Sequence, residues 1–157
     1  MNQGYDYVEM KVPAKAEFMR VIRLTASGIA SRIGFSIDDI EDIKIAISEA
    51  CTNVVQHAYE EDEEGDIIIG FGVYENRLEM MVADNGHSCN FDEIRCGIGP
   101  YSKDIGVEFM REGGLGLFLI ETLMDEVKIH QHNGVTVFMT KFVQKEQVEA
   151  NAKTSST

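Results

Sequence analysis

The segment Gly-Gly-Leu-Gly-Leu at residues 113–117 lies where an irregular stretch of the chain gives way to a helical pattern. Glycines allow close approach to the backbone, and the start of a helix offers unpaired N–H groups and the positive end of the helix dipole. These features suit an anion-binding site. A glycine-rich hinge explains the same segment equally well when it is taken alone.

A second group of polar residues, Glu49, Asn53 and His57, recurs at intervals of four positions in a segment with helical periodicity. That spacing places the three side chains on one face of a helix. An adjoining stripe of the same helix contains Ile43 and Ile47, so the polar row borders the predicted core, which favours a cleft. Taken alone, a polar row of this kind usually indicates only a solvated helix face.

A carboxylate, Asp84, directly follows the apolar strand predicted over residues 78–83, within the sequence Asp84-Asn85-Gly86. This position would put Asp84 at the end of a buried strand. A simple turn is the commoner explanation of such a tripeptide.

The elements that must position these residues are predicted from apolar periodicity, which is two in strands and 3.6 in helices. The expected strands span 5–12, 67–74, 78–83, 127–132 and 135–143, and the expected helices span 14–33, 36–59 and 115–124. The last two strands form a hairpin that turns at Asn133-Gly134. This order predicts an α+β fold, a two-layer sandwich of a mostly antiparallel sheet with helices on one face.

Helix ends and apolar stripes refine this map. Ser36 is the predicted N-cap of the second helix, and Gly34 is the predicted C-terminal stop of the first. We expect the stripe of the second helix to face the core through Ile40, Ile43, Ile47, Cys51 and Val54. The third helix is expected to do so through Leu115, Phe118, Leu119 and Leu123.

Acidic residues outnumber basic ones by 27 to 14, which gives a formal net charge of −13. Neutralising phosphates requires clustered Lys and Arg, so this balance excludes a general nucleic-acid binder and disfavours an anionic membrane surface. The expected partner is instead a protein with a basic patch, or a small ligand. No apolar run approaches the roughly 18 residues that are needed to cross a bilayer.

With 157 residues, the chain has the length of one domain. We expect that domain over residues 1–143, with a lid at about 85–113 and a disordered polar tail over 144–157. His87, Cys89 and Cys96 fit no closed zinc pattern, so we interpret them as ordinary loop residues. Three cysteines cannot all pair within the chain, and the first residues form no apolar signal segment, so a cytoplasmic protein is expected.

Read together, these motifs resemble the N, G1 and G2 boxes of the GHKL ATPase and kinase superfamily, whose ATP-binding fold is called the Bergerat fold. Order and spacing match over roughly residues 5–143, and the closer resemblance is to the bacterial anti-sigma factor serine kinases. The motifs that carry it are Glu49-x-x-x-Asn53, Asp84-x-Gly86, Gly114-x-Gly116 and Gly134-x-Thr136. One departure is Ser88, which stands where many superfamily members have a second glycine after Gly86.

The resemblance implies that the chain binds ATP and Mg²⁺. Asn53 would hold Mg²⁺, which prefers oxygen ligands such as a side-chain carbonyl. Glu49, one helical turn earlier, would take the proton from an attacking hydroxyl, and Arg111 would reach the γ-phosphate or the incoming partner. A solvated residue of the lid remains an alternative interpretation of Arg111.

The same resemblance assigns the remaining contacts to the nucleotide. Asp84 would accept a hydrogen bond from the exocyclic amine of adenine, with Thr136 assisting from the neighbouring strand, and Gly86 would leave space for the base. The metal and the backbone dipoles would supply the positive field that the acidic side chains do not. The backbone N–H groups that would bind the phosphates are those of Gly114, Leu115 and Gly116.

By this resemblance the chain would inhibit an alternative sigma factor of the sigma B type. It would also phosphorylate a serine of an anti-anti-sigma protein, the antagonist of that inhibition. A homodimer is expected because the family is dimeric, and the edge strand over residues 5–12 is a candidate for pairing. The alternative is a nucleotide-gated binding module with negligible kinase activity. Glu49 favours the enzyme, because a pure sensor needs no base beside the metal.

Overall fold

The structure of the chain is a computed structural model, which describes residues 4–58, 65–84, 91, 117–131 and 135–144. The strands are β1 (Asp6–Pro13), β2 (Asp66–Val73), β3 (Arg77–Asp84), β4 (Glu126–Gln131) and β5 (Val135–Phe142). The helical elements are the 3₁₀ turn η1 (Ala16–Phe18), α1 (Met19–Ile33), α2 (Ile37–Ala58) and a helix over residues 117–123.

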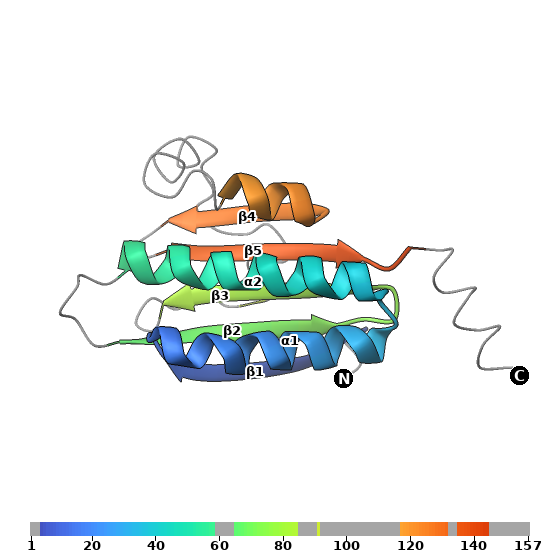
Figure 1. The fold of residues 1–157 in the computed structure, drawn as a ribbon, viewed down its shortest axis with the longest axis horizontal. Coiled ribbons are helices and arrows are strands. Elements are labelled where there is room, and N and C mark those ends of the chain that lie inside the picture. Colours follow the sequence, from blue (N-terminus) through green and yellow to red (C-terminus); the bar gives the residue numbers. More distant parts are fainter. Residues whose placement is uncertain (1–3, 59–64, 85–90, 92–116, 132–134, 145–157) are drawn as a thin grey trace, which may run out of the picture.

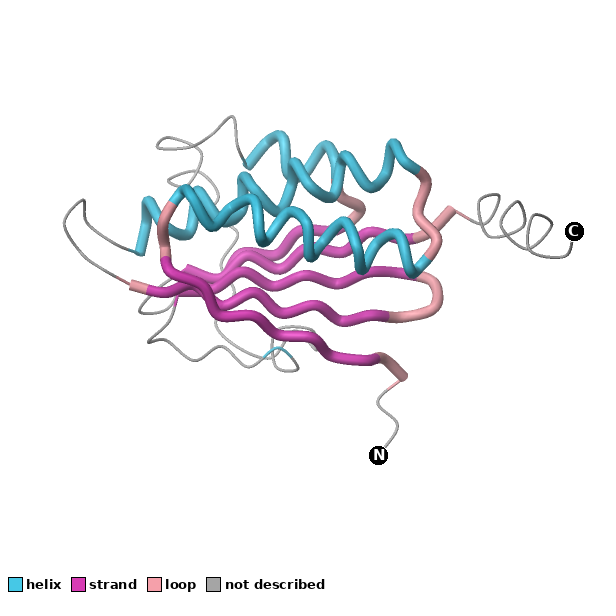
Figure 2. Tube along the Cα trace, turned by 60° about the horizontal axis from the view of Figure 1, so that its bottom comes forward, coloured by secondary structure: helices cyan, strands magenta, loops and turns pink. Residues whose placement is uncertain are grey.

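The strands form one sheet in the order β1-β2-β3-β5-β4, and each neighbouring pair is antiparallel. Figure 1 shows α1 over the β1–β2 side of this sheet, α2 over its middle, and the helix over 117–123 along β4. Figure 2 shows that all three helices cover the same face. The predicted α+β sandwich with helices on one face is therefore confirmed.

The predicted helix ends at Gly34 and Ser36 are also confirmed. Gly34 adopts a positive φ of 111°, which glycine tolerates without steric cost, and its N–H donates to the carbonyl of Ala30. Two residues later, the Ser36 Oγ accepts the backbone N–H of Asp39 at 3.1 Å. Together these bonds stop one helix and start the next within three residues.

The expected start of the first helix at residue 14 is wrong. The Ala14 N–H donates to the carbonyl of Gly65, and the Lys15 N–H donates to that of Pro13. These bonds tie residues 14 and 15 to the turn after β1 and to the chain entering β2. Regular α-helix therefore begins only at Met19, after η1.

The stripe that buries the helix over 117–123 is also different from the predicted one. Leu117 and Ile120 are buried in the core together with Met124, whereas Phe118 is 59% exposed. Apolar residues occur on both sides of this short helix, so periodicity alone does not choose the side that packs. The neighbouring sheet decides it.

The main core lies between the helices and the sheet. Alternation along each strand turns every second side chain toward the helices, as for Ile67, Ile69 and Phe71 of β2. From α2, the predicted stripe reaches this core as expected, with only Ile40 partly buried. Its fully buried members are Ile43, Ile47, Cys51 and Val54.

A buried lysine of the sheet contacts two of the helices that cover it. The Lys141 Nζ of β5 donates to the Leu123 carbonyl at 2.6 Å, at the end of the helix over 117–123. It also lies 3.9 Å from a carboxylate oxygen of Asp39 and 4.0 Å from one of Asp42, in the first turns of α2. The helix that follows the glycine-rich segment is therefore fixed relative to the helix that carries Glu49 and Asn53.

Among the residues that the structure describes, no helix is both long and apolar enough to span a membrane. The predicted lid apart from Phe91, the tail from residue 145 onward, and Cys89 and Cys96 lie outside the described residues.

Cys51 gives a test of how tightly α2 packs. Burial raises the pKa of the Cys51 thiol from 9.0 to about 12, because the thiolate is desolvated in the core. Above pH 9 the unfolded chain loses this proton while the folded chain keeps it, so the free energy of unfolding falls as the pH rises toward 12. The fall is at most about 1.4 kcal/mol per pH unit.

Urea denaturation between pH 8 and pH 10.5 measures this slope. Cys51→Ala should lower stability at every pH but flatten the pH dependence relative to the wild type. Equal slopes in the two proteins would contradict the prediction, as would rapid alkylation of Cys51 in the native state.

Candidate functional site

Four segments that are distant in sequence approach one end of the sandwich. β3 ends there at Asp84, β5 begins there at Val135, and α2 ends above them at Ala58 (Figure 1). The helix over 117–123 runs away from the same side. The chain reverses at the β2–β3 turn and between α1 and α2, which explains why the ends that carry the predicted motifs meet.

The polar row on α2 lies beside the core, as its spacing predicted. Asn53 is only 2% exposed, and Glu49, one turn earlier, is half-buried. Ala50 and Val54, which neighbour them on the helix, are fully buried. The row is therefore not an ordinary solvated helix face. The side chain of His57 lies outside the described residues.

The Asp84 carboxylate lies on the helix side of the sheet. It stands opposite Ile67 of β2, and paired residues of an antiparallel ladder point to the same face. Ile67 belongs to the core beneath the helices, and Asp84 is itself 5% exposed. Asp84 and Asn53 therefore lie in the same layer, between the sheet and α2, at the same end of the molecule.

The Asn53 side chain has an unmet hydrogen-bonding capacity. Its buried Nδ2 has no hydrogen-bond partner among the described residues. A buried amide without a partner costs about 1–3 kcal/mol, which a structural role does not explain. Since the amide also carries a carbonyl oxygen, its chemistry fits the predicted site for a hydrated Mg²⁺ ion and a phosphate.

Thr136 does not join Asp84. It pairs with Ala83 of β3 and His130 of β4, one position away from the pairs that face the helices. Strand alternation therefore turns Thr136 to the opposite face of the sheet, where Met81 and Phe138 form a second cluster. The β5 residue that shares the face of Asp84 is Val135, which is buried in the main core.

The predicted assistance of Asp84 by Thr136 is not supported by this register, and it stays a prediction that the Thr136→Val variant tests. The signal that identifies Val135 is present in the sequence, because residues 135, 137 and 139 alternate as apolar positions. The Gly134-x-Thr136 motif identifies a residue with a hydroxyl group, but it does not say which face of the sheet that residue occupies.

Five of the predicted site residues lie outside the described residues: Gly86, Arg111, Gly114, Leu115 and Gly116. Leu117 is the described residue of the segment over 113–117, and it is buried in the main core at the start of the helix over 117–123. The structure thus fixes where the chain continues after Gly116. The predicted role of the glycines as phosphate ligands stays a prediction.

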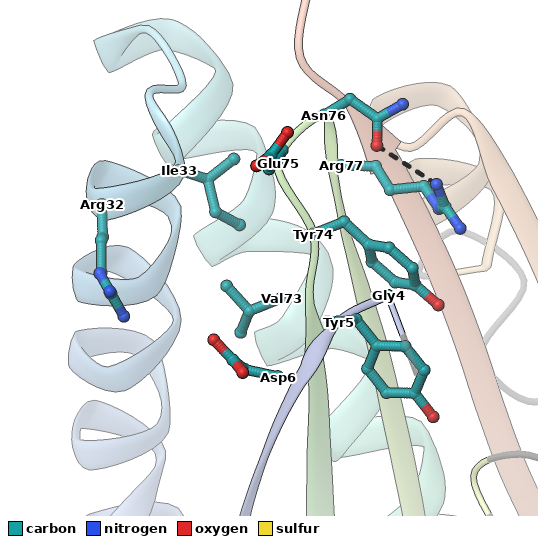
Figure 3. Close-up of a pocket in the computed structure, with 10 residues that line it drawn as sticks. All are labelled: Gly4, Tyr5, Asp6, Arg32, Ile33, Val73, Tyr74, Glu75, Asn76 and Arg77. Atoms are coloured by element: carbon teal, nitrogen blue, oxygen red, sulfur yellow. Dashed lines mark hydrogen bonds between the residues drawn. The ribbon is translucent and has the colours of Figure 1, made fainter. Parts of the chain in front are cut away.

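A hollow of about 890 Å³ lies at the other end of the sheet, far along β3 from Asp84. Figure 3 shows it between the last turn of α1 and the β2–β3 turn, with Arg32 on one wall and Tyr5 and Tyr74 on the other. Arg77 stacks over the Tyr74 ring at 3.6 Å and donates to the Asn76 Oδ1. None of the predicted nucleotide contacts lines this hollow.

Comparison with known families gives a match over most of the chain. Residues 12–141 match the model of the histidine kinase-like ATPase domain. A serine-protein kinase RsbW of Bacillus cereus (strain AH820) is 57% identical over 157 residues, which cover 100% of this chain and 98% of that protein. The serine-protein kinase RsbW of Bacillus subtilis (strain 168) is 56% identical over 149 residues, which cover 95% and 93% of the two chains.

Among solved structures, the fold is similar to that of the RsbU and RsbW domains of Rv1364c from Mycobacterium tuberculosis. The TM-score is 0.60 at 23% sequence identity, and the match covers 87% of this chain. It covers 32% of the longer mycobacterial chain. At this identity the likeness supports the fold.

The environment of Asn53 predicts that stability and ligand binding separate. Replacing Asn53 with Leu, which has a similar shape, removes the unpartnered amide, so the free energy of unfolding should stay within about 1 kcal/mol of the wild type or rise. Binding of a fluorescent ATP analogue should at the same time lose its dependence on Mg²⁺. Urea denaturation and titration with and without the metal measure the two effects. A strongly destabilised variant that keeps Mg²⁺-dependent binding would contradict this role.

The register predicts opposite outcomes for two neighbouring polar residues. Thr136→Val should leave the affinity for the ATP analogue within about twofold, because the hydroxyl faces away from α2. Asp84→Asn should weaken binding by about tenfold or more, because an amide no longer offers the charged acceptor. If Thr136→Val weakened binding as much as Asp84→Asn does, the assignment of faces would be wrong.

Proposed function

The chain belongs to the histidine kinase-like ATPase domain family and, within it, to the RsbW serine-protein kinases, and from this premise we propose that the end of the sheet at Asp84 is its kinase site. The chain is thus an ATP-dependent protein serine kinase. The site would bind ATP with Mg²⁺ and direct the γ-phosphoryl group to the serine of a protein partner.

The observation that carries this proposal is the burial of two polar residues, Asn53 and Asp84, at one end of the mainly apolar layer between α2 and the sheet. Asn53 and Asp84 are nearly inaccessible, and they lie where the core between α2 and the sheet would otherwise continue. Buried polar groups are retained at a cost to stability, so they indicate a bound polar ligand more than a structural role. Both residues belong to the motifs that the family resemblance identified.

Each described residue has a separate task in this proposal. Asp84 would accept a hydrogen bond from the exocyclic amine of adenine. This contact would discriminate against bases that have no donor at that position. Asn53 would hold Mg²⁺ through its carbonyl oxygen. Mg²⁺, when bound, neutralises charge on the phosphates. Residues 45–58 of α2 contain no Lys or Arg. The positive charge that attracts the phosphates must therefore come from groups outside this helix.

Glu49 would act as the base. Its half-buried side chain borders the layer that holds Asn53, while remaining open to an incoming hydroxyl. A carboxylate at this position would accept the serine proton as the oxygen attacks the γ-phosphorus. Proposed further contacts to the phosphates are the backbone N–H groups of residues 114–116 and the side chain of Arg111, and Gly86 would leave space for the base.

The partners follow from the family. We propose that the phosphorylated protein is an anti-anti-sigma factor, and that the same chain binds and inhibits an alternative sigma factor of the sigma B type in a stress response. The formal charge of −13 favours partners with basic surfaces. A cytoplasmic location agrees with these partners.

We also propose a homodimer. β1 lies at one edge of the sheet, where its outer backbone groups have no neighbouring strand among the described residues. Tyr7 and Val8 of this strand are about 40% exposed. An edge strand with exposed apolar side chains suits pairing with a second copy.

Glu49→Gln tests the kinase assignment. With labelled ATP, Mg²⁺ and a purified candidate anti-anti-sigma protein, the variant should transfer phosphate at least about 100-fold more slowly, because the amide accepts no proton. Its affinity for ATP should change little, since the base acts on the hydroxyl.

Glu41→Gln is the matched control. Glu41 lies two turns earlier on α2, is exposed, and forms an ion pair with Lys44 at 3.0 Å. It should keep wild-type transfer. Undiminished transfer by Glu49→Gln would remove Glu49 from the mechanism. A wild-type protein that binds ATP but forms no phosphoserine would favour the nucleotide-gated binding module.

A further inference from the structure

We propose that the hollow between the last turn of α1 and the β2–β3 turn is a docking site for a basic side chain, arginine or lysine, of a protein partner that is bound but not phosphorylated. The inference rests on the proposed function, in which the sigma factor is the partner of this kind. None of the residues that we assign to the kinase site lines the hollow.

The hollow has the size of a ligand site and an aliphatic floor. Its volume of about 890 Å³ falls within the range of known binding pockets. Ile33 of α1 and Val73 of β2 are half-buried, and Figure 3 shows both in the space between the helix and the sheet. Such a floor suits the methylene groups of a long basic side chain, which bury their stem on apolar surface and keep the charge in water.

Two carboxylates border this floor. Asp6 and Glu75 are exposed, and Figure 3 shows them on either side of Val73. Neither carboxylate forms an ion pair with another residue that the structure describes. Both charges are therefore available to a cation that enters between them.

The two arginines that line the hollow do not cancel this negative charge. Arg77 forms an ion pair with Glu79, whose Oε2 atom lies 3.5 Å from the Arg77 Nε. Arg32, on the opposite wall, is exposed and has no ion-pair partner within the described part of the chain. Two uncompensated carboxylates therefore face one uncompensated guanidinium. The formal charge of −13 adds a long-range attraction for a basic partner.

The aromatic wall of the hollow is rigid before any partner arrives. The rings of Tyr5 and Tyr74 stack with centroids 4.8 Å apart, and the Arg77 Cζ lies 3.6 Å from the centroid of Tyr74. Glu79, which holds Arg77 from the other side, is only 7% exposed. A preformed wall lowers the entropy that docking costs.

The position of the hollow indicates which partner docks there. Arg77 and Asp84 lie at opposite ends of β3, seven residues apart, which corresponds to about 23 Å along an extended strand. A side chain held beside Glu75 is therefore far from the proposed kinase site. This contact does not bring a serine of the same partner to Glu49, so it suits a partner that is held without being phosphorylated.

Asp6→Asn and Glu75→Gln test the site with a purified sigma factor of the sigma B type, labelled for fluorescence anisotropy. Each variant should raise the dissociation constant of the complex about fivefold, because it removes one carboxylate from beside the cation. Both residues are exposed, so the variants should fold as the wild type does. Unchanged affinity in both would overturn the proposal.

Arg32→Gln should have the opposite effect. It removes a positive charge from the wall that faces the docked cation, so the dissociation constant should fall about twofold or more. If Arg32→Gln weakened binding while Asp6→Asn strengthened it, the hollow would receive an anionic group, and the proposal would be wrong.

Glu121→Gln is the matched control for loss of negative charge. Glu121 is exposed on the helix over 117–123 and does not line the hollow. It changes the net charge as Glu75→Gln does, but it should keep the affinity for the sigma factor within about twofold. An equal loss of affinity in the two variants would show an effect of overall charge and would overturn the docking site.

Phosphoryl transfer separates failure of this inference from failure of the proposed function. All three hollow variants should transfer phosphate to the candidate anti-anti-sigma protein within about twofold of the wild-type rate, and a large loss would assign the hollow to the phosphoryl acceptor instead. A wild-type protein that transfers no phosphate overturns the kinase site, and one that does not bind the sigma factor overturns that partner. Wild-type transfer and binding, with unchanged sigma affinity in the variants, overturn only the docking site.

Discussion

The central position of β3, paired on both sides and covered by α2 on one face, is the constraint on which the rest of the structure depends. Because side chains alternate strictly along a strand, every residue of β3, and every residue paired to it, belongs to one of two faces. Asp84 is thereby committed to the layer that holds Asn53. Thr136 is committed to the other face, although it is only one residue from the start of β5, which lies at the same end of the sheet as Asp84.

The helix-side layer combines two incompatible demands. Its apolar residues provide the free energy that holds α1, α2 and the helix over 117–123 to the sheet. Asn53 and Asp84 interrupt that layer with polar groups, whose burial costs free energy. The Nδ2 atom of Asn53 has no hydrogen-bond partner among the described residues. Proteins generally accept such costs where a ligand recovers them, which is the physical reason for placing the kinase site at this end. The chain belongs to a family of serine-protein kinases, which agrees with this proposal.

On the opposite face of the sheet, the ring of Phe91 packs against β2. Glycines on β2 leave a recess, and Phe91 occupies it together with rings from β1 and β5. This arrangement gives the sheet two aromatic or apolar layers of different character. One packs against the helices, and the other packs against Phe91.

The sequence by itself determined the element order, the caps at Gly34 and Ser36, the α2 stripe and the family, because these depend on neighbouring residues or on motifs of fixed spacing. Only the tertiary structure decided which side of the helix over 117–123 packs, where α1 begins, and which face Thr136 occupies. Each of these depends on contacts between segments distant in the chain: the sheet under Leu117, the Gly65 carbonyl that binds Ala14, and the β3–β5 register. A motif records which residues recur, whereas packing and register decide which atoms meet.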